Sequence, residues 1–187
     1  MALLEAAAGG VNAGAERLEA RYDRLLREHG AALRRVAASY EFDPARSEDL
    51  FQDICLAVWQ ALPRFRGDSS ERTFVFRIAH NRGLTHRARR ARRSPAATAD
   101  FAEAAGVADP TTGPEAAAHD AQRRARLRAA VLRLPLVPRQ VLTLTLEGLT
   151  PREIAEVLGV SENNVAVRLS RARRLLREAL TGEGGER

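Results

Sequence analysis

The chain has 187 residues, which is enough for one ordinary hydrophobic core or two small ones. Hydrophobic residues make up 45% of it and aromatic residues only 5%, which excludes a disordered polymer and disfavours an aromatic-rich β-sandwich. The net charge is +6 and all 30 basic residues are arginine: the sign indicates a polyanionic partner, whereas the lack of lysine is typical of a GC-rich genome.

Three helices are predicted in the first part of the chain. The first has apolar residues at helical spacing from Leu18 to Tyr40. The second is predicted to begin at an N-cap on Ser47, with acidic residues in its first turn, and to end before Pro63. A short polar loop, 65–70, then leads into a third helix whose apolar start gives way to arginines.

The segment 94–120 separates this part from the rest. It is rich in Ala, Thr, Pro and Gly and contains five acidic residues and no arginine. The composition predicts a flexible acidic linker. A second domain is expected to open near Pro114 and to pack through Leu127, Val131 and Leu134.

A helix-turn-helix is predicted near the C-terminus. Pro135 and Pro138 are expected to break the chain before a short apolar helix that ends at Gly148. Residues 150–153 form a capping box with proline at the first helical position, Gly159 makes the turn, and Ser161 caps a final helix that runs to about Leu180.

The final helix has two different faces. One face is apolar and is predicted to point inward, with Val165, Leu169, Ala172 and Leu176. The outward face carries Asn163, Val167, Ser170, Arg171 and Arg174, and Arg168 and Arg173 flank it. Asn and Arg suit base edges in a major groove and flanking arginines suit phosphates. A solvated basic helix in an ordinary bundle would show the same pattern.

Opposite charges are sorted onto different helices of the first domain. Residues 41–60 hold five acids against one arginine, whereas residues 77–93 hold seven arginines and no acid. The arginine run is either a solvated face or a DNA contact. The loop 67–70 and Asn81 are suited to holding a flipped base, although Asp68 and Ser70 are also ordinary helix caps.

The acidic helix requires another partner. Its polar strip consists of Glu48, Asp49, Gln52 and Asp53. DNA would repel this strip, whereas a basic protein surface would attract it. The alternative is an exposed acidic helix that balances nearby arginines.

Enzymatic functions are poorly supported. The four histidines are scattered and none belongs to a metal-binding motif, while Cys55, the only cysteine, lies on an apolar face. A disulfide within the chain is therefore excluded, and no cofactor is expected. The chain has no apolar run of 18 residues and no signal-peptide pattern, so a cytoplasmic protein is predicted.

The order of these segments resembles the extracytoplasmic-function branch of the sigma-70 family. Residues 47–68 look like the polymerase-binding part of region 2, residues 74–81 like its promoter-melting helix, and residues 147–160 like the first half of region 4. The resemblance implies an all-α fold of two small helical domains, a region 2 bundle of three or four helices and a region 4 helix-turn-helix, joined by a flexible acidic linker. The implied division is a flexible N-terminus (1–15), region 2 (16–93), the linker (94–120), region 4 (121–181) and a tail (182–187).

The resemblance also implies a function and a set of partners. Such a protein is not itself an enzyme: it binds the β′ and β subunits of core RNA polymerase and directs initiation at promoter DNA. Further implied properties are an anti-sigma factor as partner, no membrane insertion and a monomeric free state.

The implied polymerase-binding residues are Glu48, Asp49, Gln52 and Asp53. The implied −10 residues are Arg66, Gly67, Asp68, Ser69, Ser70, Asn81, Arg82, Arg89 and Arg90. The implied −35 residues are Asn163, Asn164, Val167, Arg168, Ser170, Arg171 and Arg174.

Several positions depart from the family pattern. Phe74 stands where Trp is usual, and Thr85 replaces a usual Asp. In the recognition helix Asn163-Asn164 replaces a common Gly-Thr, and Ala166 stands where Arg is frequent, so the family's typical −35 sequence is not predicted for this chain. Arg171 still matches a usual basic position.

Two other functions remain open from the sequence. A stand-alone helix-turn-helix repressor or activator would bind duplex DNA tightly by itself, commonly as a dimer. A nucleic-acid-processing enzyme would turn over without polymerase, although the chain lacks the motifs for it.

Overall fold

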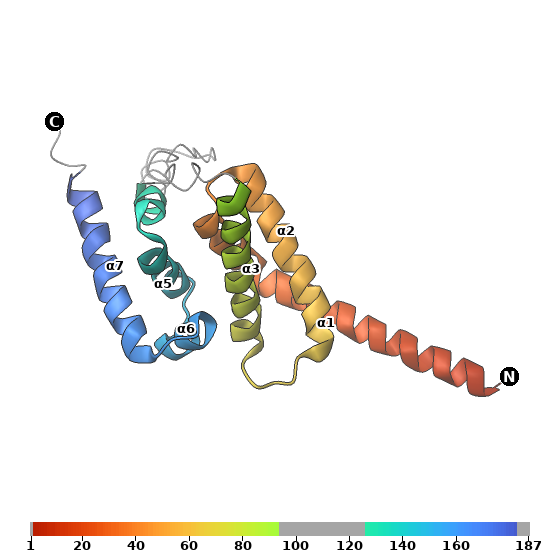
Figure 1. Ribbon diagram of the computed structural model, residues 1–187. Coiled ribbons are helices and arrows are strands. Elements are labelled where there is room, and N and C mark those ends of the chain that lie inside the picture. Colours follow the sequence, from red (N-terminus) through yellow and green to blue (C-terminus); the bar gives the residue numbers. More distant parts are fainter. Residues whose placement is uncertain (1, 94–125, 183–187) are drawn as a thin grey trace, which may run out of the picture.

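The computed structural model describes residues 2–93 and 126–182, and within these ranges every regular element is a helix (Figure 1). The first unit contains α1 (Ala2–Tyr40), α2 (Pro44–Ala61), a 3₁₀ turn η1 (Leu62–Arg64) and α3 (Glu71–Arg93). The second contains a helical stretch at 126–133, then α5 (Leu136–Leu146), α6 (Pro151–Leu158) and α7 (Glu162–Gly182). The predicted all-α fold is confirmed, while the predicted linker, 94–120, lies outside the described residues.

The helices of the first unit pack through apolar stripes that recur at helical spacing. Leu33, Ile54 and Val75, one from each long helix, are at most 1% exposed. In Figure 1 α1, α2 and α3 lie side by side, and the N-terminal end of α1 projects beyond the bundle. Three predicted helices of the first domain are therefore confirmed.

A glycine permits a close approach between α1 and α3. A Cβ atom added to Gly83 would lie 2.5 Å from the ring of Tyr40, a distance that real Cβ atoms do not reach. Tyr40 is 2% exposed and its hydroxyl lies 2.6 Å from Nδ1 of His80, so the ring also has a polar partner inside the bundle. This contact fixes where the two helices cross.

The start of α2 differs from the sequence prediction. The N-cap is Asp43, not Ser47: its Oδ1 accepts a hydrogen bond from the backbone N–H of Arg46 at 2.9 Å, and Pro44 occupies the first helical turn. Asp-Pro combines a strong N-cap with a residue that needs no hydrogen-bond partner for its nitrogen. The prediction placed the cap one turn too late, because it followed the acidic residues and overlooked this pair.

The second unit has a small core of its own. Val131, Leu134, Leu142 and Ala172 form this core, each at most 7% exposed. Two predictions are wrong here: Leu127 is 38% exposed, and Pro138 is buried in the first turn of α5 instead of breaking the chain. Proline is compatible with a first helical turn because those N–H groups lack intrahelical acceptors. The predicted opening near Pro114 lies outside the described residues.

The predicted signals around α6 are confirmed. Thr150 and Glu153 form the reciprocal capping box, and Gly159 ends the helix in the left-handed region at φ 66°. Gly148, at φ 76°, ends the preceding segment in the same conformation. Ser161 Oγ accepts a hydrogen bond from the N–H of Asn164 at 3.3 Å, as expected for the cap of α7.

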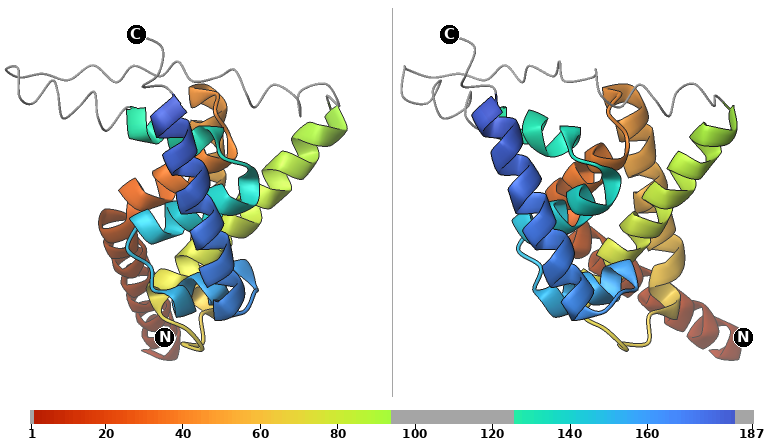
Figure 2. Two further views of the ribbon diagram at one scale, coloured as in Figure 1. Left: turned by 90° about the vertical axis from the view of Figure 1, so that its left-hand side faces the viewer. Right: turned by 60° about the vertical axis from the view of Figure 1, so that its left-hand side comes forward.

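The two units pack against one another. The main hydrophobic cluster contains side chains from both, for example Val36 and Phe76 of the first unit with Leu144 and Ile154 of the second. Helix α6 lies beside α3 in Figures 1 and 2, and α5 contacts α1. The sequence predicted two separate domains and contained no signal for this contact.

Candidate nucleic-acid and protein interfaces

Helix α7 lies on the outside of the second unit (Figure 2), and most of its exposed side chains are polar. Val165 and Ala172, on its inner face, are at most 1% exposed, whereas Val167 is 62% exposed. The other predicted outward residues are exposed as well: Asn163, Asn164, Ser170, Arg171 and Arg174, with Arg168 half-buried. The predicted division into an inner and an outer face is confirmed.

The arginines on the outer face of α7 are accessible to a polyanion. Among the described residues, the ion pair on this face joins Arg174 to Glu178 at 2.9 Å, and both side chains are more than half exposed. Such a surface pair contributes little and is screened by salt, so phosphate can compete for the arginine. The N-terminal end of α7 also carries the positive end of the helix dipole.

The loop before α3 is shaped by a glycine and a cap. Gly67 has φ 83°, a conformation that favours glycine over other residues. Ser70 Oγ accepts a hydrogen bond from the N–H of Thr73 at 3.0 Å, so the capping role of Ser70 is observed. The rings of Phe65 and Phe74 lie 4.8 Å apart and anchor the loop to the helix. Arg66, Asp68 and Ser70 are exposed, and Ser69 is half-buried.

The arginine run on α3 divides into exposed and internal members. Asn81, Arg82 and Arg89 are exposed. Arg90 is instead directed toward Glu41, with its Nη1 donating to Oε1 at 2.7 Å, and its side chain is 24% exposed. Arg90 therefore has a structural role that the predicted DNA-contacting role did not include.

Glu41 is a buried acid, 1% exposed. Burial by itself would raise its pKa, but hydrogen bonds from His86 and from the backbone N–H of Asp43, together with Arg90, hold the pKa below its ordinary value. One of the five acids of the segment 41–60 is thus sealed inside the fold and satisfied there.

The rest of the acidic strip on α2 remains accessible. Asp49, Gln52 and Asp53 are exposed, on the side opposite the buried Leu50 and Ile54. Glu48 differs, because it pairs with Arg34 of α1. Three of the four predicted polymerase-binding residues therefore present free polar groups to a partner.

Cys55 is half-buried on α2, and burial is the main cause that raises its pKa. A raised pKa keeps the thiol protonated, which does not suit a nucleophile. Within the described residues no three His, Cys, Asp or Glu side chains gather as metal ligands. None of the helices in the same ranges combines the length and apolarity that a membrane span requires.

The polar residues at the junction of the two units were not predicted from the sequence. Glu147, at the end of α5, has its carboxylate 2.7 Å from Nε and 2.6 Å from Nη2 of Arg35. Arg72 donates to the backbone carbonyl of the same residue. Arg139 of α5 is 3% exposed and lies over the ring of Phe42 at 4.6 Å. These residues carry no distinguishing pattern, since each is an ordinary charged residue on a helix or at its end.

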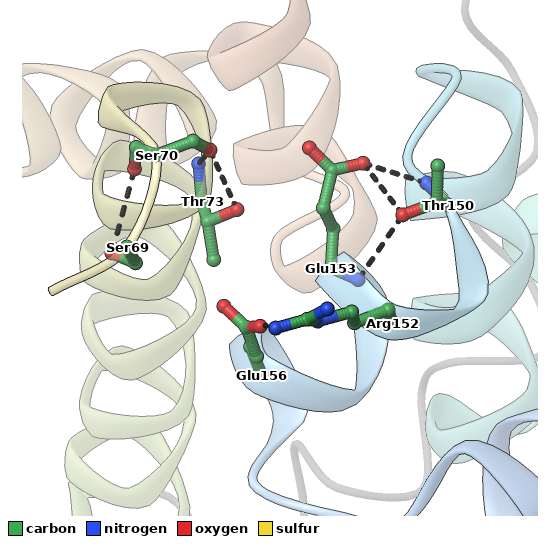
Figure 3. A network of polar contacts seen from close by, with 7 residues as sticks. All are labelled: Ser69, Ser70, Thr73, Thr150, Arg152, Glu153 and Glu156. Carbon is green, nitrogen blue, oxygen red and sulfur yellow. Dashed lines mark hydrogen bonds and ion pairs between the residues drawn. The ribbon is translucent and has the colours of Figure 1, made fainter.

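The junction brings the loop before α3 close to the start of α6. Figure 3 shows Ser69, Ser70 and Thr73 on one side and the capping box of Thr150 and Glu153 on the other. The candidate base-holding loop and the helix-turn-helix are therefore neighbours in this arrangement.

A three-helix bundle with an exposed acidic strip, joined to a helix-turn-helix with a free polar recognition face, defines a DNA-binding protein of the transcription machinery. Comparison with known families gives two matches: Sigma-70 region 2 over residues 25–93 and Sigma-70, region 4 over residues 124–176.

Individual relatives agree with these matches. The RNA polymerase sigma factor CnrH of Cupriavidus metallidurans is 32% identical over 167 residues, 87% of each chain. The ECF RNA polymerase sigma factor SigM of Mycobacterium tuberculosis is 31% identical over 160 residues, 85% of this chain and 76% of the relative.

Solved structures are similar too. The structure of CnrH in complex with the cytosolic domain of CnrY has a TM-score of 0.61 and 27% identity and covers 88% of this chain and 90% of CnrH. The sigma factor RpoE, in complex with the anti-sigma factor NepR from Bartonella quintana, has a TM-score of 0.71 and covers 89% of this chain and 99% of RpoE; at 22% identity it supports the fold alone.

The chain belongs to the extracytoplasmic-function branch of the sigma-70 family. It is therefore an RNA polymerase sigma factor, a transcription initiation factor and not an enzyme, and the stand-alone regulator is not supported.

Proposed function

We propose that this sigma factor binds core polymerase through the exposed part of the α2 strip and contacts promoter DNA through α3, its preceding loop and α7. The supporting observation is the separation of charge onto different exposed surfaces. Asp49 and Asp53 face outward on α2, while Arg82 and Arg89 do so on α3. A partner with basic groups and a partner with phosphates can then bind at the same time.

Each DNA contact has a separate task in this proposal. The loop 65–70 and Asn81 hold an unpaired base of the −10 element, and the exposed arginines of α3 contact the phosphate backbone. The outer face of α7 contacts base edges of the −35 element, with Arg168 on phosphates. Residues 16–93 and 121–181 are the two functional domains, and 94–120 joins them.

The two domains have to separate for both contacts to form together. The −10 and −35 elements lie about 25 base pairs apart along the DNA. At about 3.4 Å per base pair, this separation is about 85 Å of duplex. In the packed arrangement the loop 65–70 and α6 are neighbours, and α7 follows α6 after a short turn. Residues 94–125 are 32 in number and can reach about 110 Å when extended, so the chain is long enough to open.

An anti-sigma factor is the proposed regulator. The two similar structures described above hold sigma factors in complexes, one with the cytosolic domain of CnrY and one with the anti-sigma factor NepR. We infer that this chain is a cytoplasmic protein, monomeric when free, and that such a partner binds it.

Charge reversal on the α2 strip tests the proposal. The double variant Asp49→Arg/Asp53→Arg should lose retention on purified core polymerase and run-off transcription, because like charges now meet. Asp23→Arg, an exposed acid on α1, is the matched control and should retain both activities. Circular dichroism checks that all variants fold. Unchanged retention of the double variant would show that another surface binds polymerase.

A further inference from the structure

The junction between the two units is held on one side by Glu147. Its side chain is 8% exposed and accepts two parallel hydrogen bonds from Arg35, while its backbone carbonyl accepts one from Arg72. The hydrogen bonds to Glu147 raise the pKa of Arg35. A bidentate arginine–carboxylate pair is among the stronger polar contacts in proteins. The first and second units are therefore clamped together at the end of α5.

The same junction buries a charge that has no counter-charge among the described residues. Arg139, about two turns before Glu147 on α5, is 3% exposed. Its Nε and Nη1 are buried and have no hydrogen-bond acceptor in the part of the chain that the structure describes. No carboxylate of those residues pairs with it, although Glu41 lies in the neighbouring network. Arg139 therefore differs from Arg90, which has a carboxylate partner.

The groups around Arg139 come from the first unit. Phe42 contributes a ring face at 4.6 Å, and Arg87 and Tyr40 are the charged and titratable neighbours. Burial, and then the repulsion of Arg87, lower the pKa of Arg139 to about 10. The guanidinium is still charged near neutral pH and is thus forced into the junction in its charged form.

The net effect of burying Arg139 on the closed arrangement is unfavourable. Contact with an aromatic ring attracts a guanidinium, but this attraction is smaller than the loss of hydration of a buried charge without a partner. Because the surrounding groups belong to the other unit, separating the units returns Arg139 to water. Arg139 thus favours the open arrangement while Glu147 favours the closed one.

We propose that Arg139, buried in the domain junction, favours separation of the two units of the sigma factor. It thereby opposes the pair between Glu147 and Arg35, which favours the closed arrangement. Its relevance to transcription rests on the proposed function, since opening allows both promoter elements to be contacted. The effect on the arrangement of the domains does not rest on it and is measured on the free protein.

The test compares two neutral replacements with a clamp variant. Arg139→Met and Arg139→Gln each remove the charge, and should raise the ratio of closed to open molecules by about tenfold. Glu147→Gln should lower that ratio by about two- to fivefold, because the partly exposed pair with Arg35 loses its charge. Arg177→Met, an exposed arginine of α7, is the control and should leave the ratio unchanged.

The ratio is measured by energy transfer between two dyes. They are attached to the exposed sites Ala45→Cys and Thr181→Cys in a Cys55→Ser background, in the full chain without partners. A closed fraction that stays constant or falls in both Arg139 variants overturns the proposal. If one variant fails to fold by circular dichroism, the other decides the result.

Run-off transcription then relates the domain ratio to function. Arg139→Met should reduce transcription at limiting protein concentration by the same factor by which it favours closure, and Glu147→Gln should partly restore it in the double variant. A changed domain ratio without any change in transcription would refute the requirement for opening, but would leave the role of Arg139 in the junction intact.

Discussion

The carboxylate of Glu147 is held by both donor atoms of the Arg35 fork, although the two residues are 112 positions apart in the chain. This pair joins α1 to the end of α5. It adds a polar contact to the apolar cluster that the two units share.

Removing this pair should weaken the packing in a salt-dependent way. Arg35 is 53% exposed, so solvent screens the interaction, and Arg35→Met should lower the free energy of unfolding by only about 0.5–1 kcal/mol. Urea unfolding at low salt and at about 0.5 M salt measures the difference, which should shrink as the Debye length falls. An equally large loss at both salt concentrations would indicate lost packing instead of lost charge.

Gly83 should not tolerate a side chain. Gly83→Ala places a methyl group 2.5 Å from the Tyr40 ring, and we expect a loss of about 1–3 kcal/mol in unfolding free energy. Gly30→Ala is the matched control, since nothing lies within 4 Å of its added Cβ and alanine is the better helix former. Thermal melts should show opposite shifts. Equal shifts would mean that α1 and α3 can move apart easily.

Arg89 and Arg90 are neighbours in sequence with different tasks. Arg90→Ala removes a partner of the buried Glu41 and should cost about 2–3 kcal/mol of stability, whereas Arg89→Ala should change it by less than about 0.5 kcal/mol. Arg89→Ala should instead weaken binding to −10 DNA in the polymerase complex. Chemical unfolding and electrophoretic mobility assays measure the two effects. The same loss of stability in both variants would contradict the division.

Stability should fall in acid partly through Glu41. Its pKa in the folded protein lies below the ordinary value of 4.5, because the hydrogen bonds outweigh burial. The stabilisation from ionised Glu41 is complete above pH 4.5 and is lost as the pH falls through the folded pKa.

His80 affects stability at higher pH. Burial lowers its pKa below 6.5, so the free energy of unfolding also declines as the pH falls below 6.5. Unfolding from pH 7 to pH 3 should therefore show both declines, and Glu41→Gln should reduce only the lower one, because the pKa values of Glu71 and Glu153 also lie below the ordinary value. A lower decline of unchanged size in Glu41→Gln would assign it to these other acids.

The recognition helix should distinguish base contacts from phosphate contacts. Arg171→Ala should cost about 1–3 kcal/mol on the preferred −35 sequence and relax the preference at one position. Arg173→Ala, equally exposed, should weaken all sequences alike and reduce the salt dependence by about one counterion. Binding of a promoter series by the polymerase complex measures both. Identical behaviour would show that α7 is oriented differently on DNA.

The local features were largely predictable. The capping box at Thr150, the turn at Gly159 and the inner face of Val165 and Ala172 are confirmed, because each depends on residues within about four positions of one another. The errors at Ser47 and Pro138 are local as well. Each arose where two local signals competed. At α2 the acidic residues after Ser47 suggested a helix start there, but the Asp-Pro pair forms the cap; at α5 Pro138 suggested a break, but proline is compatible with the first helical turn.

By itself the sequence determined an all-helical chain, the position of its helix-turn-helix and the sorting of acidic and basic residues onto different helices, because periodicity and charge order are written along the chain. Only the tertiary structure decided that Glu41 is buried, that Glu147 joins the two units and that Arg139 is buried with no carboxylate partner in the described part of the chain. Each of these depends on groups more than 40 positions away, and a charge reveals its energetic role only once the fold has determined which groups replace water around it.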